Sequence, residues 1–303
     1  MPDTFRRESE AIVSGQELDL DRVVSGESGI VAGRRARARA RLDDLLDDAA
    51  LWLRLVPPRL DAAARKATAA GQVQVIGLYS ADFAPFMARS AAQLARSRRE
   101  VGLTLGALDR AAPALAEHTV AEGLRGGGKF ENLNVLLEAA PPAGADWVIA
   151  LDDDVELPRA FLDRFLFLAE RFGFQLAQPA LRRTSHAAWP VCRRARWTVA
   201  RTTRFVEIGP MVAFHRSVRT ELLPFPALRM GWGLDSHWAG LARERGWRLG
   251  VVDAVPVRHE ARETASQYDR QAAIEELRAF LAGRPHIDRE TALEVVGRHL
   301  EWS

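Results

Sequence analysis

The feature that most constrains this chain is a series of short apolar segments separated by helical segments. The apolar segments lie at 73–78, 101–108, 147–151 and 174–178. The residues between them place apolar side chains at helical spacing. Strands joined through helices build an α/β fold with a mixed, mainly parallel sheet and helices on both faces. Ligands bind such sheets beyond the carboxyl ends of the strands, so residues just after Leu78, Leu108 and Leu151 are expected near any site.

The regions outside this alternation predict a division into three parts. Residues 1–70 are expected to form an N-terminal arm and a helical extension, and residues 71–265 a catalytic domain. Residues 266–303 are expected to form two amphipathic C-terminal helices, broken at Gly283 to Pro285. Residues 34–70 and the C-terminal helices could pair subunits or cover the edge of the sheet, so a homo-oligomer is an open expectation.

The helix that is predicted to begin at Arg34 and to be stopped by Pro57-Pro58 carries an unusual charge pattern. Leu42, Leu45, Leu46, Ala49 and Leu53 fall at helical spacing. A run of arginines precedes them, and four aspartates lie among them. The pattern favours a solvated helix face. Contact with anionic lipid or nucleic acid is the weaker alternative.

Composition excludes several protein classes. Hydrophobic residues make up 48% of the 303 residues and charged residues 27%, as in ordinary globular proteins. The single cysteine, Cys192, excludes an intramolecular disulfide framework and a multi-cysteine zinc site, so a cytoplasmic location is expected, with peripheral membrane association as an alternative. The net charge is only +2, and the arginine and alanine bias is typical of a GC-rich bacterial coding sequence. No nucleic-acid partner is expected.

Three adjacent carboxylates follow the apolar segment at 147–151 directly. Side chains alternate along an extended chain, so Asp152 and Asp154 should point to the same side, with Asp153 opposite. Carboxylates crowded at a strand end need a compensating positive charge, and a divalent cation with oxygen ligands fits. A polar turn before the next helix is the alternative interpretation.

A second segment, Gly231-Trp-Gly-Leu-Asp235, combines glycines, an indole and a carboxylate. Glycines let a backbone approach a ligand closely, and an indole face suits stacking on a sugar or base. Asp235 could act as a general base beside a hydroxyl group. Alternatively, Trp232 is a core residue and Asp235 caps the helix that follows.

Two further segments carry weaker signals. The glycine-rich segment before Lys129 opens a predicted helix, where backbone N–H groups can bind phosphate, although its spacing is not that of a Walker A loop. A flexible loop is an equally good interpretation. His259 ends an apolar stretch, and it becomes a candidate ligand only if the fold brings it to Asp154.

Taken in order, these segments resemble nucleotide-sugar glycosyltransferases of the GT-A fold. The aspartates at 152–154 match the Asp-x-Asp motif of that family, and residues 127–134 resemble the Gly-Lys…Leu-Asn segment of family 2 glycosyltransferases. Residues 231–235 and 257–259 resemble the Gly-Trp-Gly…Glu-Asp and histidine segments of β-1,4-galactosyltransferases. Leu234 departs from the latter pattern, because that family has a glutamate there.

A narrower resemblance covers residues 150–260. The order of Leu-Asp-Asp-Asp-Val, Leu176 to Leu181, Phe205 to Met211, Gly-Trp-Gly-Leu-Asp and Val251 to His259 is similar to that in a plant-abundant family. That family is named for lysine-ketoglutarate reductase trans-splicing and is poorly characterised.

The resemblance implies metal-dependent transfer of a sugar from a nucleotide diphosphate sugar, with UDP as the default, to an acceptor hydroxyl with inversion. It implies that Asp154, His259 and Asp152 hold Mn²⁺ or Mg²⁺ and that Asp235 is the catalytic base. The implied donor or substrate contacts are Asp153, Lys129, Asn134, Gly231, Trp232 and Gly233. The acceptor is open between a saccharide, a lipid-linked sugar and a small molecule.

Two other functions remain open at this point. Asp152-Asp-Asp-Val155 matches the start of haloacid-dehalogenase phosphatases, with Asp152 as nucleophile and Asp253 as a candidate second acidic residue. A non-catalytic protein that binds a nucleotide or sugar is the other alternative.

Overall fold

The computed structural model describes residues 23, 31, 33–67, 71–260 and 270–302. The strands are β1 (Gln72–Tyr79), β2 (Glu100–Ala107), β3 (Thr119–Ala121), β4 (Ala145–Leu151), β5 (Val155–Glu156), β6 (Leu176–Leu181), β7 (Ala200–Thr203), β8 (Met211–His215), β9 (Leu249–His259) and β10 (Val295–His299). The α-helices are α1 (Arg34–Leu53), α2 (Val56–Lys66), α3 (Ala84–Leu94), α4 (Lys129–Ala139), α5 (Phe161–Arg171), α6 (Arg216–Leu222), α7 (Leu234–Arg245), α8 (Arg270–Leu281) and α9 (Arg289–Ala292). None of these helices is long and apolar enough to cross a bilayer.

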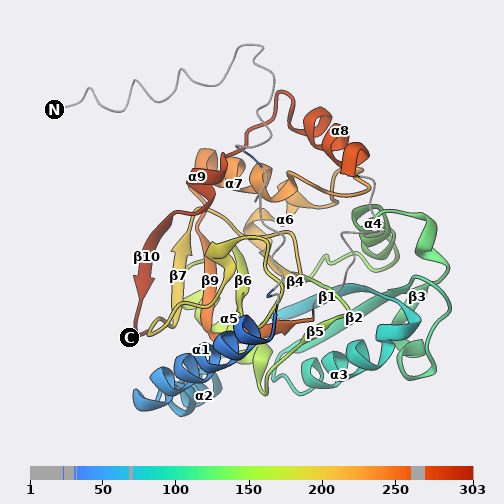
Figure 1. Ribbon diagram of the computed structural model, residues 1–303. Coiled ribbons are helices and arrows are strands. Elements are labelled where there is room, and N and C mark those ends of the chain that lie inside the picture. The colour runs from blue at the N-terminus through green and yellow to red at the C-terminus, as the bar shows by residue number, and fades with distance from the viewer. Residues whose placement is uncertain (1–22, 24–30, 32, 68–70, 261–269, 303) are drawn as a thin grey trace, which may run out of the picture.

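One mixed sheet runs through the protein in the order β10-β7-β9-β6-β8-β4-β1-β2-β3, with β5 paired to β9 off this path (Figure 1). β4, β1, β2 and β3 pair in parallel, as do β6 and β9. β8 is antiparallel to β4 and β6, and β7 is antiparallel to β9 and β10. Among the described strands of this main sheet, β7 and β8 are therefore antiparallel to all the others, which point in one direction. The expected mixed, mainly parallel sheet is confirmed.

Helices cover both faces of the sheet, as two glycines on neighbouring strands make clear. A Cβ at Gly77 of β1 would meet Met87 of α3, whereas a Cβ at Gly106 of β2 would meet Leu136 of α4. Gly77 is in register with Leu105, one residue before Gly106, so the two glycines face opposite sides of the sheet. α3 and α4 therefore lie on opposite faces.

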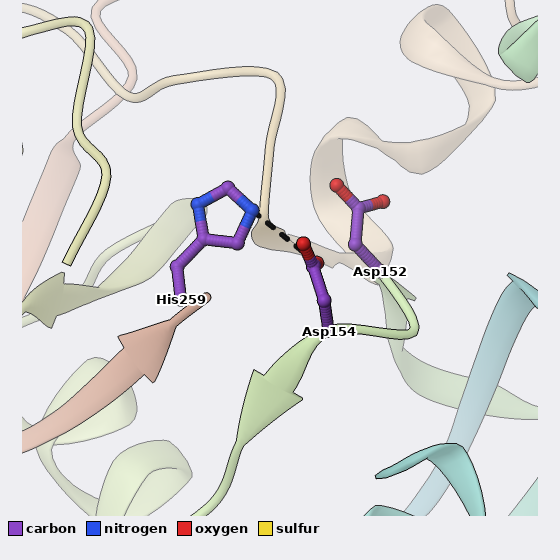
Figure 2. Close-up of side chains that lie close together, drawn as sticks. All are labelled: Asp152, Asp154 and His259. Atoms are coloured by element: carbon purple, nitrogen blue, oxygen red, sulfur yellow. Dashed lines mark ion pairs between the residues drawn. The ribbon is translucent and has the colours of Figure 1, made fainter. Parts of the chain in front are cut away.

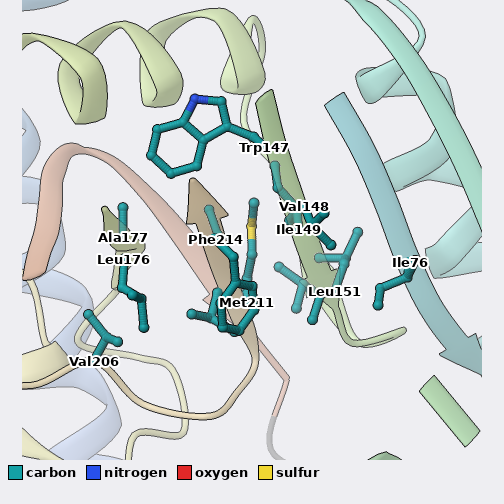
Figure 3. Packing of buried hydrophobic residues seen from close by; sticks show 14 of the residues in the cluster. Ile76, Trp147, Val148, Ile149, Leu151, Leu176, Ala177, Val206, Met211 and Phe214 are labelled. Atoms are coloured by element: carbon teal, nitrogen blue, oxygen red, sulfur yellow. The ribbon is translucent and has the colours of Figure 1, made fainter. Parts of the chain in front are cut away.

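β4 runs through the apolar centre of the protein. Its residues from Trp147 to Leu151 are all buried, and Phe214 and Met211 of β8 pack in the same region (Figure 3). A strand covered on both faces is apolar at every position, because neither side chain direction leads to water. Each fully buried side chain of this size contributes roughly 1.5–3 kcal/mol. The apolar run ends at Leu151, so the polar chemistry begins at the next residue.

α1 is attached to the protein through its acidic face. Asp44 accepts hydrogen bonds from the backbone N–H groups of Arg183 and Thr184, at 2.8 and 3.2 Å. Asp47 pairs with Arg183 and Arg196, at 2.8 and 2.5 Å. Both aspartates are buried. The prediction of a solvated face is therefore wrong for them, and the side of the helix that binds the protein is the polar one.

The C-terminal region departs from its predicted secondary structure. α8 is the first expected helix, but the second is reduced to the short α9, which is followed by a strand. That strand, β10, pairs antiparallel with β7 at the edge of the sheet (Figure 1). β-branched Val295 and Val296 favour a strand here, because their side chains pack well on a pleated surface.

A buried ion pair joins β7 to β9. The Arg201 guanidinium donates to both carboxylate oxygens of Asp253, each at 2.9 Å. Asp253 also accepts from the backbone N–H of Ala195 and the hydroxyl of Thr198. Arg201 and Asp253 are almost fully buried, so each charge depends on the other for its compensation.

Arg201→Met should therefore lower the free energy of unfolding by about 3–5 kcal/mol, because it leaves the Asp253 carboxylate buried without its cation. Urea denaturation measures the change. The matched control is Arg245→Met, which breaks the exposed pair with Glu221 and should cost less than about 1 kcal/mol. Equal losses in the two variants would contradict this interpretation.

Candidate functional site

The three aspartates form the turn between β4 and β5, and their side chains alternate as expected. Asp153 is buried, and its Oδ2 accepts a hydrogen bond from the backbone N–H of Ser80 at 2.9 Å. This bond joins the turn to the carboxyl end of β1. Asp152 and Asp154 point the other way. Asp153 is thus placed against β1, and not in the carboxylate cluster that its neighbours form.

His259 reaches the aspartates because β5 pairs with the end of β9. Val155 lies in register with His259, and the backbone N–H of Glu260 donates to the carbonyl of Asp154 at 3.1 Å. The Nε2 of His259 lies 3.3 Å from an Asp154 carboxylate oxygen (Figure 2). One ligand atom each from Asp152, Asp154 and His259 lies within 4.8 Å of the others. Two carboxylates and an imidazole at this spacing could hold a divalent cation.

Two opposite effects act on the pKa of His259, namely its burial and the negative charge of its neighbours. Burial alone would lower it, but the hydrogen bond and charge of Asp154, with the charges of Asp152 and Glu207, raise the pKa above its ordinary value of 6.5. The His186 ring lies beside it, at 5.6 Å between centroids. Burial, together with the charges of His259 and Arg193, lowers the pKa of His186.

Lys129 lies at the same site, as the first residue of α4. Its Nζ is 2.6 Å from Asp152 Oδ1. The backbone N–H of Asp152 donates to the carbonyl of Pro210, which brings the segment before β8 alongside. A Cβ at Gly209 would lie 3.1 Å from Asp152 and 3.2 Å from Lys129, so a side chain there would crowd the ion pair. The N-terminal turn of α4 therefore faces the aspartate turn.

The Gly-Trp-Gly segment is held by packing and by one glutamate. Glu276 of α8 accepts hydrogen bonds from the backbone N–H groups of Arg229, Met230 and Gly231, at 2.7, 2.9 and 2.9 Å. A Cβ at Gly231 would meet the ring of Phe130 at 2.0 Å, and one at Gly233 would meet Leu277 at 2.4 Å. Both glycines also have positive φ angles, of 76° and 85°. The glycines thus serve the turn and its packing.

The side chains in and around this segment fall into different environments. Trp232 is half-buried at the edge of the apolar core. Asp235 is buried in the first turn of α7, whose N-cap is Gly233 and not Asp235. Asn134 donates to and accepts from the backbone of Phe225, each at 2.8 Å, so its amide is used in holding that loop.

Glu207 is a further site residue that the sequence analysis did not single out. Its Oε2 is buried with no hydrogen-bond partner among the described residues. Burial, together with the charge of Asp235, raises the pKa of Glu207 to about 8. Burial raises the pKa of Asp235 to about 7, although the backbone of Ser236 and Ile208 bonds to its carboxylate. The segment Phe205 to Met211 was the available signal, since a lone glutamate stands in an otherwise apolar run.

The second carboxylate required by the phosphatase alternative is used elsewhere. Asp253 is bound by Arg201, Thr198 and Ala195 within the sheet and does not join the cluster around Asp152. β4 is also a central strand preceded by β1, β2 and β3, whereas phosphatases of that class carry the motif near the start of the domain. This arrangement removes the support for phosphatase chemistry.

The chain matches no protein-family model and no curated protein. It is similar in structure to GalNAc-T7, whose crystal structure was determined with UDP, GalNAc and Mn²⁺, with a TM-score of 0.50 and 12% identity over 65% of this chain. That match spans 45% of the GalNAc-T7 chain, so this chain corresponds to less than half of it. A mycobacterial protein matches 75% of this chain and 78% of its own length, with 17% identity and a TM-score of 0.44. The first likeness shows a GT-A-like fold, as the sequence predicted, and leaves the narrower plant-abundant family unconfirmed.

The two raised carboxyl pKa values predict how stability depends on pH. Each group binds its proton more tightly in the folded protein than in the unfolded chain, where the pKa values are 3.8 for Asp235 and 4.5 for Glu207. Stability should therefore be greatest below those values and fall as pH rises towards about 7 to 8. The slope should reach about 1.4 kcal/mol per pH unit for each group.

Asp235→Asn should flatten this dependence, because the amide cannot ionise but still accepts the backbone hydrogen bonds. Urea denaturation at about pH 5 and about pH 8 measures the difference. Glu156→Gln, which removes an exposed carboxylate on β5, should leave the wild-type slope unchanged. The assignment fails if the Asp235 variant loses as much stability as the wild type between these two pH values.

Proposed function

We propose that this protein is a metal-dependent glycosyltransferase that moves a sugar from a nucleotide diphosphate sugar, with UDP as the expected nucleotide, to an acceptor hydroxyl. The observation that carries the proposal is the meeting of Asp152, Asp154 and His259 at the carboxyl end of β4. These residues come from two segments more than a hundred positions apart, and they meet in a fold that is similar to that of a UDP- and Mn²⁺-bound protein.

The donor set fits a hard or borderline divalent cation such as Mn²⁺ or Mg²⁺. Carboxylate oxygens with one imidazole suit these ions, whereas a soft-metal site would need thiolates, and Cys192 is buried away from the cluster. A bound cation would neutralise the charge that develops on the leaving diphosphate. Lys129, at the start of α4 and 2.6 Å from Asp152, would add a second positive charge beside the same phosphates.

Asp235 is the proposed base. A carboxyl with a pKa of about 7 is poised to take a proton from an acceptor hydroxyl near neutral pH. Glu207 lies beside it and disfavours a second negative charge, so the pair holds one proton more readily than none. A single base that activates the acceptor, with no covalent intermediate, gives inversion at the sugar carbon. Trp232 is the proposed stacking surface for a sugar ring.

Titration calorimetry with UDP, in the presence and absence of Mn²⁺, tests the donor site. Binding should require Mn²⁺ and should weaken by about 100-fold or more in Asp154→Ala and in His259→Ala, because each variant removes one ligand. Glu156→Gln lies two residues from Asp154 and is exposed, so it serves as the matched control and should bind as the wild type does.

Metal-independent binding, or no binding of UDP, GDP or ADP to folded protein, would contradict the proposal. The non-catalytic alternative is tested separately by release of UDP from UDP-sugars. Binding that remains metal-dependent while Asp235→Asn and the wild type both release no UDP would favour a binding protein. Turnover that Asp235→Asn abolishes, with UDP affinity retained, supports the proposed base.

A further inference from the structure

The outer face of α1 is apolar and exposed. Leu42, Leu46 and Leu53 follow one another at intervals of four and seven residues, so they lie on one stripe of the helix. Their exposed fractions are 56%, 44% and 79%, and Leu45 beside them is 66% exposed. We call Leu42, Leu45, Leu46 and Leu53 the leucine stripe. Helices of globular proteins usually turn such a stripe towards the core, so the orientation of α1 is reversed.

Ion pairs on the opposite face hold α1 in this orientation. Asp48 pairs with Arg182 and Arg194, at 3.1 and 2.5 Å, in addition to the bonds of Asp44 and Asp47 described above. Leu51 is buried on the same inward face. Turning the leucine stripe inward would break these contacts and expose Leu51. The exposed stripe is therefore built into the docked helix.

The arginines extend the leucine stripe towards the start of the helix. Arg35 and Arg39 lie seven and three residues before Leu42, which places them on the same side. Both are exposed, and no acidic residue occurs between Gly33 and Leu42. The acidic residues of α1 begin at Asp43 and gather on the inward side. The outer surface thus combines positive charge at one end with exposed leucine at the other.

A cleft of about 750 Å³ runs along the flank of α1. Arg37, Arg41 and Leu45 line one side of it, and His186 and Arg258 line the other. His186 is the residue whose ring contacts His259. The cleft therefore connects the surface of α1 with the neighbourhood of the candidate metal site.

We propose that the leucine stripe, with Arg35 and Arg39, docks this protein on an anionic lipid surface. Leucines can enter the boundary between headgroups and acyl chains, while arginines bind lipid phosphates. A second copy of the chain is a poorer occupant, because the arginines need negative charge and the aspartates of α1 face inward. The inference does not depend on the proposed glycosyl transfer.

Co-sedimentation with vesicles tests the docking surface. Wild-type protein should bind vesicles that contain phosphatidylglycerol, bind far less to pure phosphatidylcholine, and be released by high salt. Leu42→Gln/Leu46→Gln/Leu53→Gln should weaken binding by about ten-fold or more, because three apolar contacts are lost. Arg35→Gln/Arg39→Gln should also weaken it by about ten-fold or more at low salt.

Two matched controls show whether vesicle binding depends on this surface or on exposed apolar and basic residues anywhere on the protein. Val120→Gln/Val296→Gln alters exposed valines on β3 and β10, and Arg96→Gln/Arg298→Gln alters exposed arginines elsewhere; both should bind as the wild type does. All altered side chains are exposed, so thermal unfolding should match the wild type and confirm folding.

Three results would overturn the proposal. The first is no binding to anionic vesicles at low salt, and the second is equal binding to neutral and anionic vesicles. The third is a wild-type dimer in sedimentation that becomes a monomer in the triple leucine variant, with no vesicle binding. That last result would assign the surface to a second copy of this chain.

Discussion

The two-residue pairing of β5 with the end of β9 brings the parts of the site together. β4 delivers Asp152 and Asp154 to the edge of the sheet, but nothing in β4 itself supplies a nitrogen ligand. Val155 pairs with His259, and that register places the imidazole beside Asp154. A shift by one residue would turn His259 to the opposite face, because side chains alternate along a strand. The two residue pairs between β5 and β9 thus determine whether His259 lies beside the two aspartates.

The charges around this pairing are unevenly distributed. Asp152, Asp154, Glu207 and Asp235 carry negative charge in one region of the protein, and Lys129 and His259 oppose them. Burial raises the pKa of both Asp235 and Glu207, and the charge of Asp235 raises that of Glu207 further, because crowded carboxylates repel one another. The same crowding favours any ligand that brings positive charge to Asp152 and Asp154. Proton binding at Glu207 and cation binding at Asp152 and Asp154 would both relieve this negative charge.

Much of the sheet could be predicted because burial leaves a direct trace in the sequence. β4 is apolar at every position from Trp147 to Leu151, and this run stops at Asp152, so both the strand and the place of the site followed from its pattern. The final strand, β10, was missed because a short edge strand buries little and its pattern is weak. Lys129 and His259 were candidates from the sequence, whereas Glu207 was not, since the fold alone brings its carboxyl group near the charge of Asp235.

The roles of glycines and aspartates were the hardest to predict from the sequence, because each residue type has several structural uses. Gly231 and Gly233 serve positive φ angles and close packing against Phe130 and Leu277. Asp44 and Asp47 looked like a solvated face, but their partners are arginines far along the chain. Spacing along a helix shows which side chains share a face. It does not show whether that face meets water or an ion-pair partner.

Glu276 has a consequence for how the Trp232 loop can move. Its carboxylate binds three successive backbone N–H groups just before Trp232, and it belongs to α8. Bonds to a charged acceptor are stronger than neutral ones, so three on one carboxylate couple the loop firmly to the helix. We expect the loop and α8 to shift together as a rigid unit. Any motion that admits or releases a molecule beside Trp232 would then be a displacement of a packed helix, on a slower timescale than that of a free surface loop.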